Sequence, residues 1–195
     1  MNYHNSNCYV SCESEFDRVP APLAKKVDAA DVYVIESDKH EEALERTVTR
    51  LCGISEESWD YSGVFYTNCF RSNKPILLTS LGFFGPAVPQ RLQEPVAYVV
   101  DVQIGELIVM PCNHKTSWRF TTSVSGTESV FYVSFPSPFR VIPNVWYTIK
   151  FQLEGPHTLR GSSQLDRVKS TDGVIFDFFQ GSMQMPSLKY IRRYC

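Results

Sequence analysis

The chain has 195 residues, of which 43% are hydrophobic and 21% are charged, and its formal net charge is −2. This composition is typical of a folded domain, and a chain of this length can bury a core without disulfides or structural metal. The weak net charge argues against binding to nucleic acid or to an acidic membrane surface.

The sequence also indicates a cellular compartment. Its first twenty residues are polar and lack the apolar segment of a secretory signal, and no apolar run reaches the length of a membrane helix. No Asn-x-Ser/Thr glycosylation site occurs, and the six cysteines show no compact disulfide framework. We therefore expect a soluble protein of the reducing cytoplasm.

The composition divides the chain into three segments. Residues 1–30 are polar and irregular, which predicts a mobile tail. Residues 31–58 are expected to form a small appendage that contains a strand at 32–35 and a short helix. From residue 59 the pattern becomes that of a β domain, which is expected to continue to residue 195.

The short helix is predicted between Asp38 and Gly53. Asp38 and Glu41 have the spacing of a capping box, and a glycine is a common helix end. An apolar row at helical spacing runs through Leu44, Val48 and Leu51. Because such a short helix is marginal in water, we expect its apolar face to dock on the β domain.

Extended segments follow in chain order. Apolar and polar residues alternate along 96–104, where a Gly105-Glu106 turn is expected to close a hairpin with a strand at 107–110. The clearest alternation lies at 145–153, after a Pro143-Asn144 turn. Further strands are expected at 64–70, 76–84, 117–122, 129–135, 173–180 and 187–194. This succession without helical crossovers predicts an all-β fold, namely an antiparallel β-sandwich of jelly-roll type with a short N-terminal helix.

Candidates for chemistry are weak. The sequence has no P-loop, nucleophile elbow or Rossmann fingerprint. His4, Cys8 and Cys12 are spaced by four, as metal ligands on a helix would be, but they lie in the polar tail. Cys112 and His114 are close enough in sequence to act as nucleophile and base, but a Cys beside a His in a loop is more often a coincidence. We expect no catalytic residue, metal or other cofactor, and hence a protein that is not an enzyme.

The three tryptophans differ in what their surroundings predict. Trp59 is expected in the core. Trp146 interrupts the polar face of its strand, so that either the core or an outer contact surface would suit it. Trp118 follows a serine and precedes an arginine, and it also fits either place.

Several motifs of the β domain occur in an order that is known from one family. They are W-D-Y-S-G at 59–63, L-G-F-F-G at 81–85, F-Y-V-S-F at 131–135, V-I-P-N-V-W-Y-T at 141–148, L-E-G-P at 153–156 and Met185-Pro186. Together they resemble the PHR domain of large neuronal ubiquitin ligases and of adaptors in which this domain follows BTB and BACK domains. A departure from the family is that Gly181-Ser182-Met183 replaces a longer Gly/Asn-rich loop.

The resemblance implies a jelly-roll sandwich that binds protein partners and does not catalyse a reaction. The implied partners are ubiquitin ligase components, cullin complexes among them, or the substrates of such ligases. Residues 1–58 show no RING, BTB or BACK domain, so we expect neither a complete ligase nor a standard cullin adaptor. Two other functions stay open, a free-standing competitor of longer PHR proteins and a sandwich that binds a small molecule or carbohydrate.

Recognition by a sandwich is expected at the loops between its strands. We expect two such loops, at 112–118 and 156–167, and Arg and Trp are enriched where binding energy concentrates. The predicted partner-binding residues are His114, Lys115, Trp118, His157, Arg160, Asp166 and Arg167. Alternatively, each of them is a solvated turn residue.

Overall fold

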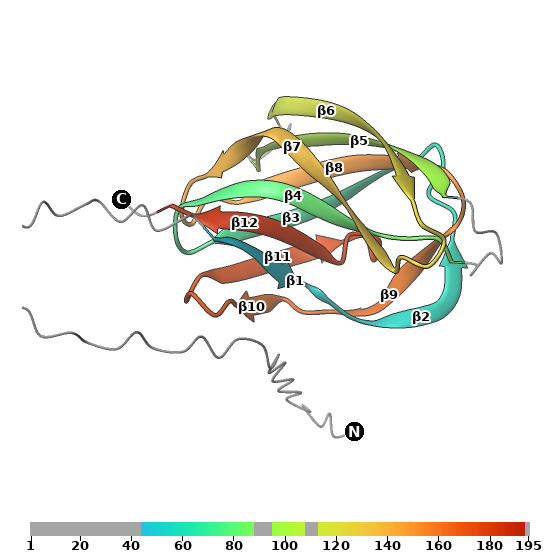
Figure 1. Cartoon of the computed structure of the whole chain (residues 1–195). Coiled ribbons are helices and arrows are strands. Elements are labelled where there is room, and N and C mark those ends of the chain that lie inside the picture. The colour runs from blue at the N-terminus through green and yellow to red at the C-terminus, as the bar shows by residue number, and fades with distance from the viewer. Residues whose placement is uncertain (1–43, 88–94, 108–112, 194–195) are drawn as a thin grey trace, which may run out of the picture. The chain divides into compact units, whose positions relative to one another are not determined.

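The computed structural model of the chain describes residues 44–87, 95–107 and 113–193. Within these residues all regular secondary structure is β-strand, as Figure 1 shows. The strands are β1 (Glu45–Thr49), β2 (Leu51–Trp59), β3 (Phe65–Ser72), β4 (Ile76–Phe84), β5 (Val96–Glu106), β6 (Asn113–Val124), β7 (Val130–Val141), β8 (Tyr147–Glu154), β9 (Thr158–Gln164), β10 (Arg167–Lys169), β11 (Ile175–Gly181) and β12 (Ser187–Arg192). Within the described residues, no helix is long and apolar enough to cross a bilayer.

Two antiparallel sheets form the sandwich. The four-stranded sheet has the order β1-β12-β4-β7, and the six-stranded sheet has the order β10-β11-β3-β8-β5-β6. In Figure 1 the four-stranded sheet lies toward the viewer and covers the inner strands of the other sheet. β2 and β9 pair as a separate two-stranded ribbon. The predicted all-β antiparallel sandwich is confirmed.

The core lies between the two sheets and is built by alternation along each strand. Tyr98, Val100, Val102 and Ile104, which the sequence places on one side of a strand, are all fully buried in β5. Rings from opposite sheets meet, as where Tyr98 stacks on Phe131 with a centroid distance of 5.1 Å. Burying one large apolar side chain stabilises a fold by about 1.5–3 kcal/mol, so this inner face dominates the stability.

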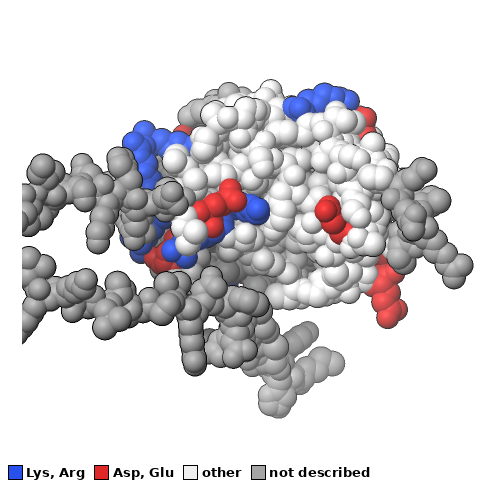
Figure 2. Space-filling view, viewed as in Figure 1, with Lys and Arg blue, Asp and Glu red and all other residues white. Residues whose placement is uncertain are grey.

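The outer face of the four-stranded sheet carries few charges. Figure 2 shows this side of the sandwich, where uncharged atoms cover most of the surface and the charged side chains form small separate groups. One ion pair of this sheet joins Lys189 of β12 to Glu45 of β1 at 3.5 Å, and the same lysine lies over the ring of Tyr132. These contacts join three of the four strands across their outer surface.

The predicted N-terminal helix is wrong in the part that the structure describes, and its remainder lies outside the described residues, as do the strand at 32–35 and the tail 1–30. Residues 45–49 form β1, which pairs with β12 from Glu45↔Ile191 to Thr49↔Ser187. Leu44 is exposed while Val48 and Leu51 are buried, so the expected apolar row does not share one face. β-branched residues at 47–49 favour a strand, and the free edge of β12 provides the partner.

The predicted hairpin at Gly105-Glu106 is also wrong. Both residues continue β5 and pair with His114 and Asn113 at the start of β6. The register with β6 shifts between Ile104 and Gly105, where residue 115 of β6 is skipped, so the irregularity is a bulge of β6 opposite a glycine that continues β5. The expected turn at Asn144 is confirmed, since Asn144 has a positive φ of 59° and its N–H donates to the carbonyl of Ser72 at 2.7 Å.

Candidate functional site

Strand β11 places two consecutive phenylalanines on opposite faces of the six-stranded sheet. Phe178 points into the core and is 5% exposed, whereas Phe179 points outward and is 58% exposed. The alternation of a strand causes this difference, because successive side chains leave the backbone on opposite sides. Asp177 has the same parity as Phe179 and therefore belongs to the outer face as well.

Trp146 lies beside Phe179 on this outer face. It precedes β8 directly, and its backbone carbonyl accepts a hydrogen bond from the N–H of Leu107 at 2.7 Å. Its half-buried ring meets the ring of Phe179 edge-on, with a centroid distance of 6.4 Å and an interplanar angle of 72°. The guanidinium of Arg71 from β3 lies over the indole at 5.0 Å, as in a cation–π contact.

Asp177 connects two arginines next to these rings. Its carboxylate accepts a hydrogen bond from Arg167 Nε at 2.6 Å and one from Arg71 Nε at 2.8 Å. The bond from Arg167 is the largest influence on the pKa of Asp177, and together with the bond from Arg71 it outweighs burial and holds that pKa below its ordinary value. We call Arg71, Trp146, Arg167, Asp177 and Phe179 the aromatic–arginine surface.

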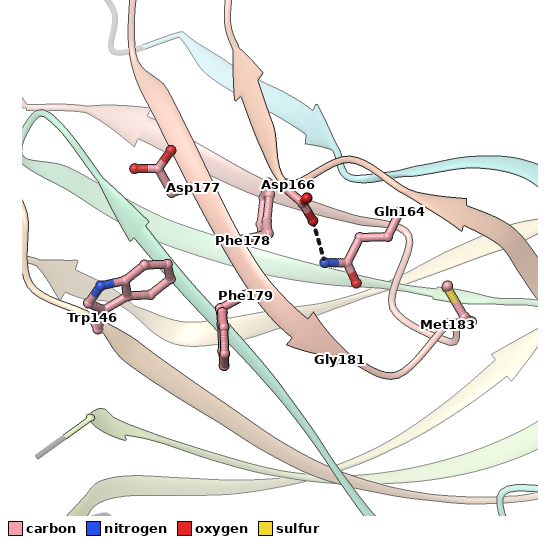
Figure 3. A pocket seen from close by; sticks show the side chains of 8 residues that line it. All are labelled: Trp146, Gln164, Asp166, Asp177, Phe178, Phe179, Gly181 and Met183. Carbon is pink, nitrogen blue, oxygen red and sulfur yellow. Dashed lines mark hydrogen bonds between the residues drawn. The ribbon is translucent and has the colours of Figure 1, made fainter. Parts of the chain in front are cut away.

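A cavity of about 730 Å³ opens at this surface. Figure 3 shows its lining, which is mostly apolar and also includes two carboxylates and one amide. The lining residues are Trp146, Gln164, Asp166, Asp177, Phe178, Phe179, Gly181 and Met183. The cavity is thus bounded by the outer face of β11, by the segment between β9 and β10, and by the turn before β12.

A buried arginine supports one wall of this cavity. Arg50 is 1% exposed and donates to Gln164 Oε1 at 2.7 Å and to the carbonyls of Ser182 and Met185 at 3.0 and 3.2 Å. Burial lowers the pKa of Arg50 to about 10, so the group is still a cation at neutral pH. Gln164 in turn donates from Nε2 to Asp166 Oδ1 at 3.4 Å. The amide of Gln164 thus links the buried guanidinium of Arg50 to the carboxylate of Asp166 by two hydrogen bonds.

The glycine of the Gly181-Ser182-Met183 segment is required by close packing. A Cβ at Gly181 would overlap Oδ1 of Asn68 and would lie 3.2 Å from Nη2 of Arg50. Ser182 supplies a carbonyl to Arg50, and Met183 lines the cavity. The short segment that departs from the family pattern is therefore a structural part of this wall.

The structure brings together two of the seven predicted partner-binding residues. Asp166 lines the cavity and Arg167 binds Asp177. His157 lies elsewhere, with its Nε2 3.9 Å from Asp60 Oδ2. Arg160 also lies elsewhere, 4.3 Å over the ring of Trp59.

The first predicted loop contributes little to the aromatic–arginine surface. The ring of Trp118 packs against Phe135 with a centroid distance of 4.5 Å, and Trp118 lines a second cavity of about 260 Å³ between β3, β5 and β6. The side chains of His114 and Lys115 lie outside the described part of the structure. A binding role for the seven residues stays a prediction.

The predicted placement on loops holds for His157 and Asp166, which lie between strands, and is wrong for the other five residues, which lie in strands. β6 begins at Asn113, β9 covers Thr158–Gln164, and β10 begins at Arg167. β9 pairs with β2, and β6 pairs with β5. The polar residues of β6 and β9 therefore belong to strands whose backbones are hydrogen-bonded to a neighbouring strand. Polar residues alone did not distinguish a loop from a strand that faces solvent on one side.

Sequence reasoning missed Arg71 and Phe179 and left Trp146 undecided. A usable pattern existed for Phe179, because it follows Asp177 by two residues and must therefore share the polar face of a strand. Arg71 had no such pattern, since it meets Asp177 only through the pairing of β3 with β11. Within the described residues, no three His, Cys, Asp or Glu side chains are grouped so that they could hold a metal ion.

In a comparison with models of known protein families, residues 52–187 match the PHR domain. The match covers β2 to β11 and the turn that leads into β12. It therefore includes every residue of the aromatic–arginine surface.

Proposed function

The chain belongs to the PHR domain family, and on this premise we propose that it is a recognition module that binds a protein partner for a ubiquitin ligase. In this proposal the chain carries out no reaction of its own. Its partner is either a ligase component or a substrate that the ligase modifies.

The observation that carries this proposal is the exposed aromatic–arginine surface. Trp and Arg are enriched among residues that dominate binding energies, and aromatic residues are enriched in protein interfaces generally. Trp146 and Phe179 are held next to each other by strand geometry, and Arg71 is fixed between Trp146 and Asp177. Rings and guanidinium groups that are already ordered lose little conformational freedom when a partner binds.

A second candidate function is the binding of a small molecule or carbohydrate. The specific observation in its favour is the cavity of about 730 Å³, since small-molecule sites usually have volumes of roughly 300–1,000 Å³. Gln164 and Asp166 supply polar groups on one wall. The cavity lies against the outer face of a sheet, which suits a partner that covers the surface better than a ligand that must be enclosed.

The test is purification of the tagged full chain from cells, followed by quantitative mass spectrometry. We expect ligase subunits or their substrates to be recovered with the wild-type chain and to decrease with Phe179→Ser. Partners shared with longer PHR proteins, recovered without ligase subunits, would instead support a free-standing competitor. A chain that retains no protein, but whose melting temperature rises with a metabolite, would support the second candidate and contradict the first.

A further inference from the structure

We propose that the aromatic–arginine surface binds a short segment of a partner protein in which an acidic residue adjoins a large apolar or aromatic residue. This inference rests on the proposed recognition function and names the chemistry of the partner. Three features carry it, namely the two arginines and the rings of the surface and the carboxylate of Asp166 in the adjoining cavity.

The two arginines form a preorganised site for one additional carboxylate. Each binds Asp177 through Nε only, so the terminal Nη groups of both guanidiniums make no further hydrogen bond to the described residues. The group of Arg71, Arg167 and Asp177 carries a net charge of one positive unit. Lys169 follows Arg167 by two residues on β10 and has the same parity, which adds a positive charge to this face. Arginine forks prefer planar, doubly hydrogen-bonded acceptors, and a carboxylate is such a group.

The exposed rings supply the apolar half of the site. Phe179 stands beside the half-buried indole of Trp146, and the cavity next to them is also lined by Phe178 and Met183. A large apolar side chain placed there would cover Phe179 and remove its surface from water. An acidic residue alone would leave these rings exposed, so we expect the apolar neighbour to be part of the recognised segment.

Asp166 restricts where the acidic residue can lie. In Figure 3 Trp146 and Asp177 lie to one side of Phe179, and Asp166 lies to the other, joined to Gln164 by a hydrogen bond. A second acidic residue over Asp166 would meet a like charge. The acidic residue of the partner is therefore expected beside Arg71 and Arg167, and a hydrogen-bond donor is expected opposite Asp166.

Rings beside arginines could also bind single-stranded nucleic acid by stacking. The overall charge of −2 and the carboxylate of Asp166 both disfavour a chain of phosphates. We therefore favour a protein segment.

The experiment is selection from a library of random peptides displayed on phage, with the full chain immobilised. We expect enriched peptides to carry Asp or Glu next to Phe, Trp, Leu or Met. Synthetic fluorescein-labelled forms are then titrated against the wild type and variants. Phe179→Ser and Arg167→Glu should each weaken binding at least ten-fold, while Asp166→Asn should strengthen it.

The same face of the sheet offers matched controls. Phe65 is an exposed ring with Lys150 over it at 4.6 Å, and Arg119 is an exposed arginine paired with Asp101 at 2.6 Å. Phe65→Ser and Arg119→Glu should leave peptide binding unchanged. Circular dichroism and melting curves of every variant should match the wild type, so that a loss of binding reports the surface and not the fold.

Several results would overturn the inference. These are no enrichment, enriched peptides without acidic residues, equal effects of the control variants, or tighter binding of an oligouridine probe than of any peptide. The chain itself contains Glu15-Phe16-Asp17, which has the chemistry of the proposed segment. If Phe16→Ser in the full chain strengthened peptide binding, the surface would instead belong to this N-terminal segment.

Failure of this inference can be distinguished from failure of the proposed function. Ligase subunits that are recovered equally with the wild type and with Phe179→Ser would reject the surface and retain the function. If acidic–apolar peptides bind the surface but no ligase subunit is recovered with the chain, the inference is retained and the proposed ligase function is rejected.

Discussion

Phe178 and Phe179 are neighbours in the sequence, but their surroundings in the two faces of the six-stranded sheet are opposite. The inner ring belongs to the hydrophobic core, and its centroid lies 5.8 Å from the guanidinium of Arg50. The outer ring lies mostly in solvent beside Trp146. The comparison shows that residue type does not decide the role of an aromatic side chain in this sheet, whereas its parity along the strand does.

The arginines on the two sides of this sheet also differ in their surroundings. Arg50 is buried, and its two terminal nitrogens donate to two carbonyls and an amide without a directly bound carboxylate, while its Nε has no partner among the described residues. Arg71 and Arg167 share a carboxylate at a surface that water reaches. An inner arginine of this kind stabilises the fold, while the outer pair has hydrogen-bonding groups available for a partner.

The largest effect on stability is expected from a substitution of Phe178 on the inner face. Phe178→Ala is expected to lower the free energy of unfolding by about 3–5 kcal/mol, because it removes a buried ring and leaves a cavity in the core. Urea denaturation followed by circular dichroism measures this change. A loss below about 1 kcal/mol would contradict the assignment of this ring to the core.

Arg50→Ala tests whether the buried arginine is structural. The change leaves the buried carbonyl of Met185 and two part-buried acceptors, the carbonyl of Ser182 and Gln164 Oε1, without their donor, and a buried unpaired group costs about 1–3 kcal/mol. We expect a total loss of roughly 3 kcal/mol in the same denaturation experiment, allowing for local rearrangement. Arg71→Ala is the matched control, and it should cost less than about 1 kcal/mol because its ion pair is partly exposed. Equal losses for the two variants would remove the distinction between them.

Asp177→Asn tests how much the ion pairs of the outer face contribute to stability, because this contribution depends on pH. The folded-state pKa of Asp177 lies below its ordinary value of 3.8, so its ion pairs stabilise the fold fully above that pH and lose their effect as pH falls through the lowered pKa. The variant should be less stable than the wild type by at most about 1 kcal/mol near neutral pH. This difference should shrink toward zero at pH values below 3.8. Unfolding curves over a pH series would measure it, and a difference that persists in acid would point to lost packing instead.

Phe179→Ala should have the smallest effect on stability. Substitutions at exposed sites away from special contacts usually change stability by less than about 0.5 kcal/mol. The melting temperature of the variant should therefore stay close to that of the wild type, although its peptide binding is lost. A large destabilisation would show that this ring supports the fold and would weaken its assignment to recognition.

The strands that the sequence predicted well have a common property. β5 and β8 bury one face against the opposite sheet, so their apolar and polar residues alternate over many positions. β2 and β9 pair in a ribbon with few buried residues, and they lack this alternation. The apolar spacing at 44–51 matched a helix by coincidence, since β1 is defined by its pairing with the distant β12.

The candidate site was also predictable only in part, because its residues come together through the pairing of distant strands. Asp166 and Arg167 were proposed from residue type, and the structure places both at the cavity or beside it. The meeting of Arg71 with Asp177 depends on the pairing of strands more than a hundred residues apart, as its sequence separation of 106 shows. The local sequence of either strand holds no information about that partner.

The position of β12 between β1 and β4 has a consequence for how the chain folds as it is synthesised. Its residues 187–191 pair with 45–49 on one side, and 187–192 pair with 76–82 on the other. Two early strands must therefore wait until the ribosome has released residue 192 before either gains its central neighbour. Until then one edge of each of these strands lacks its partner, and an unpaired strand edge is a template for pairing with another chain.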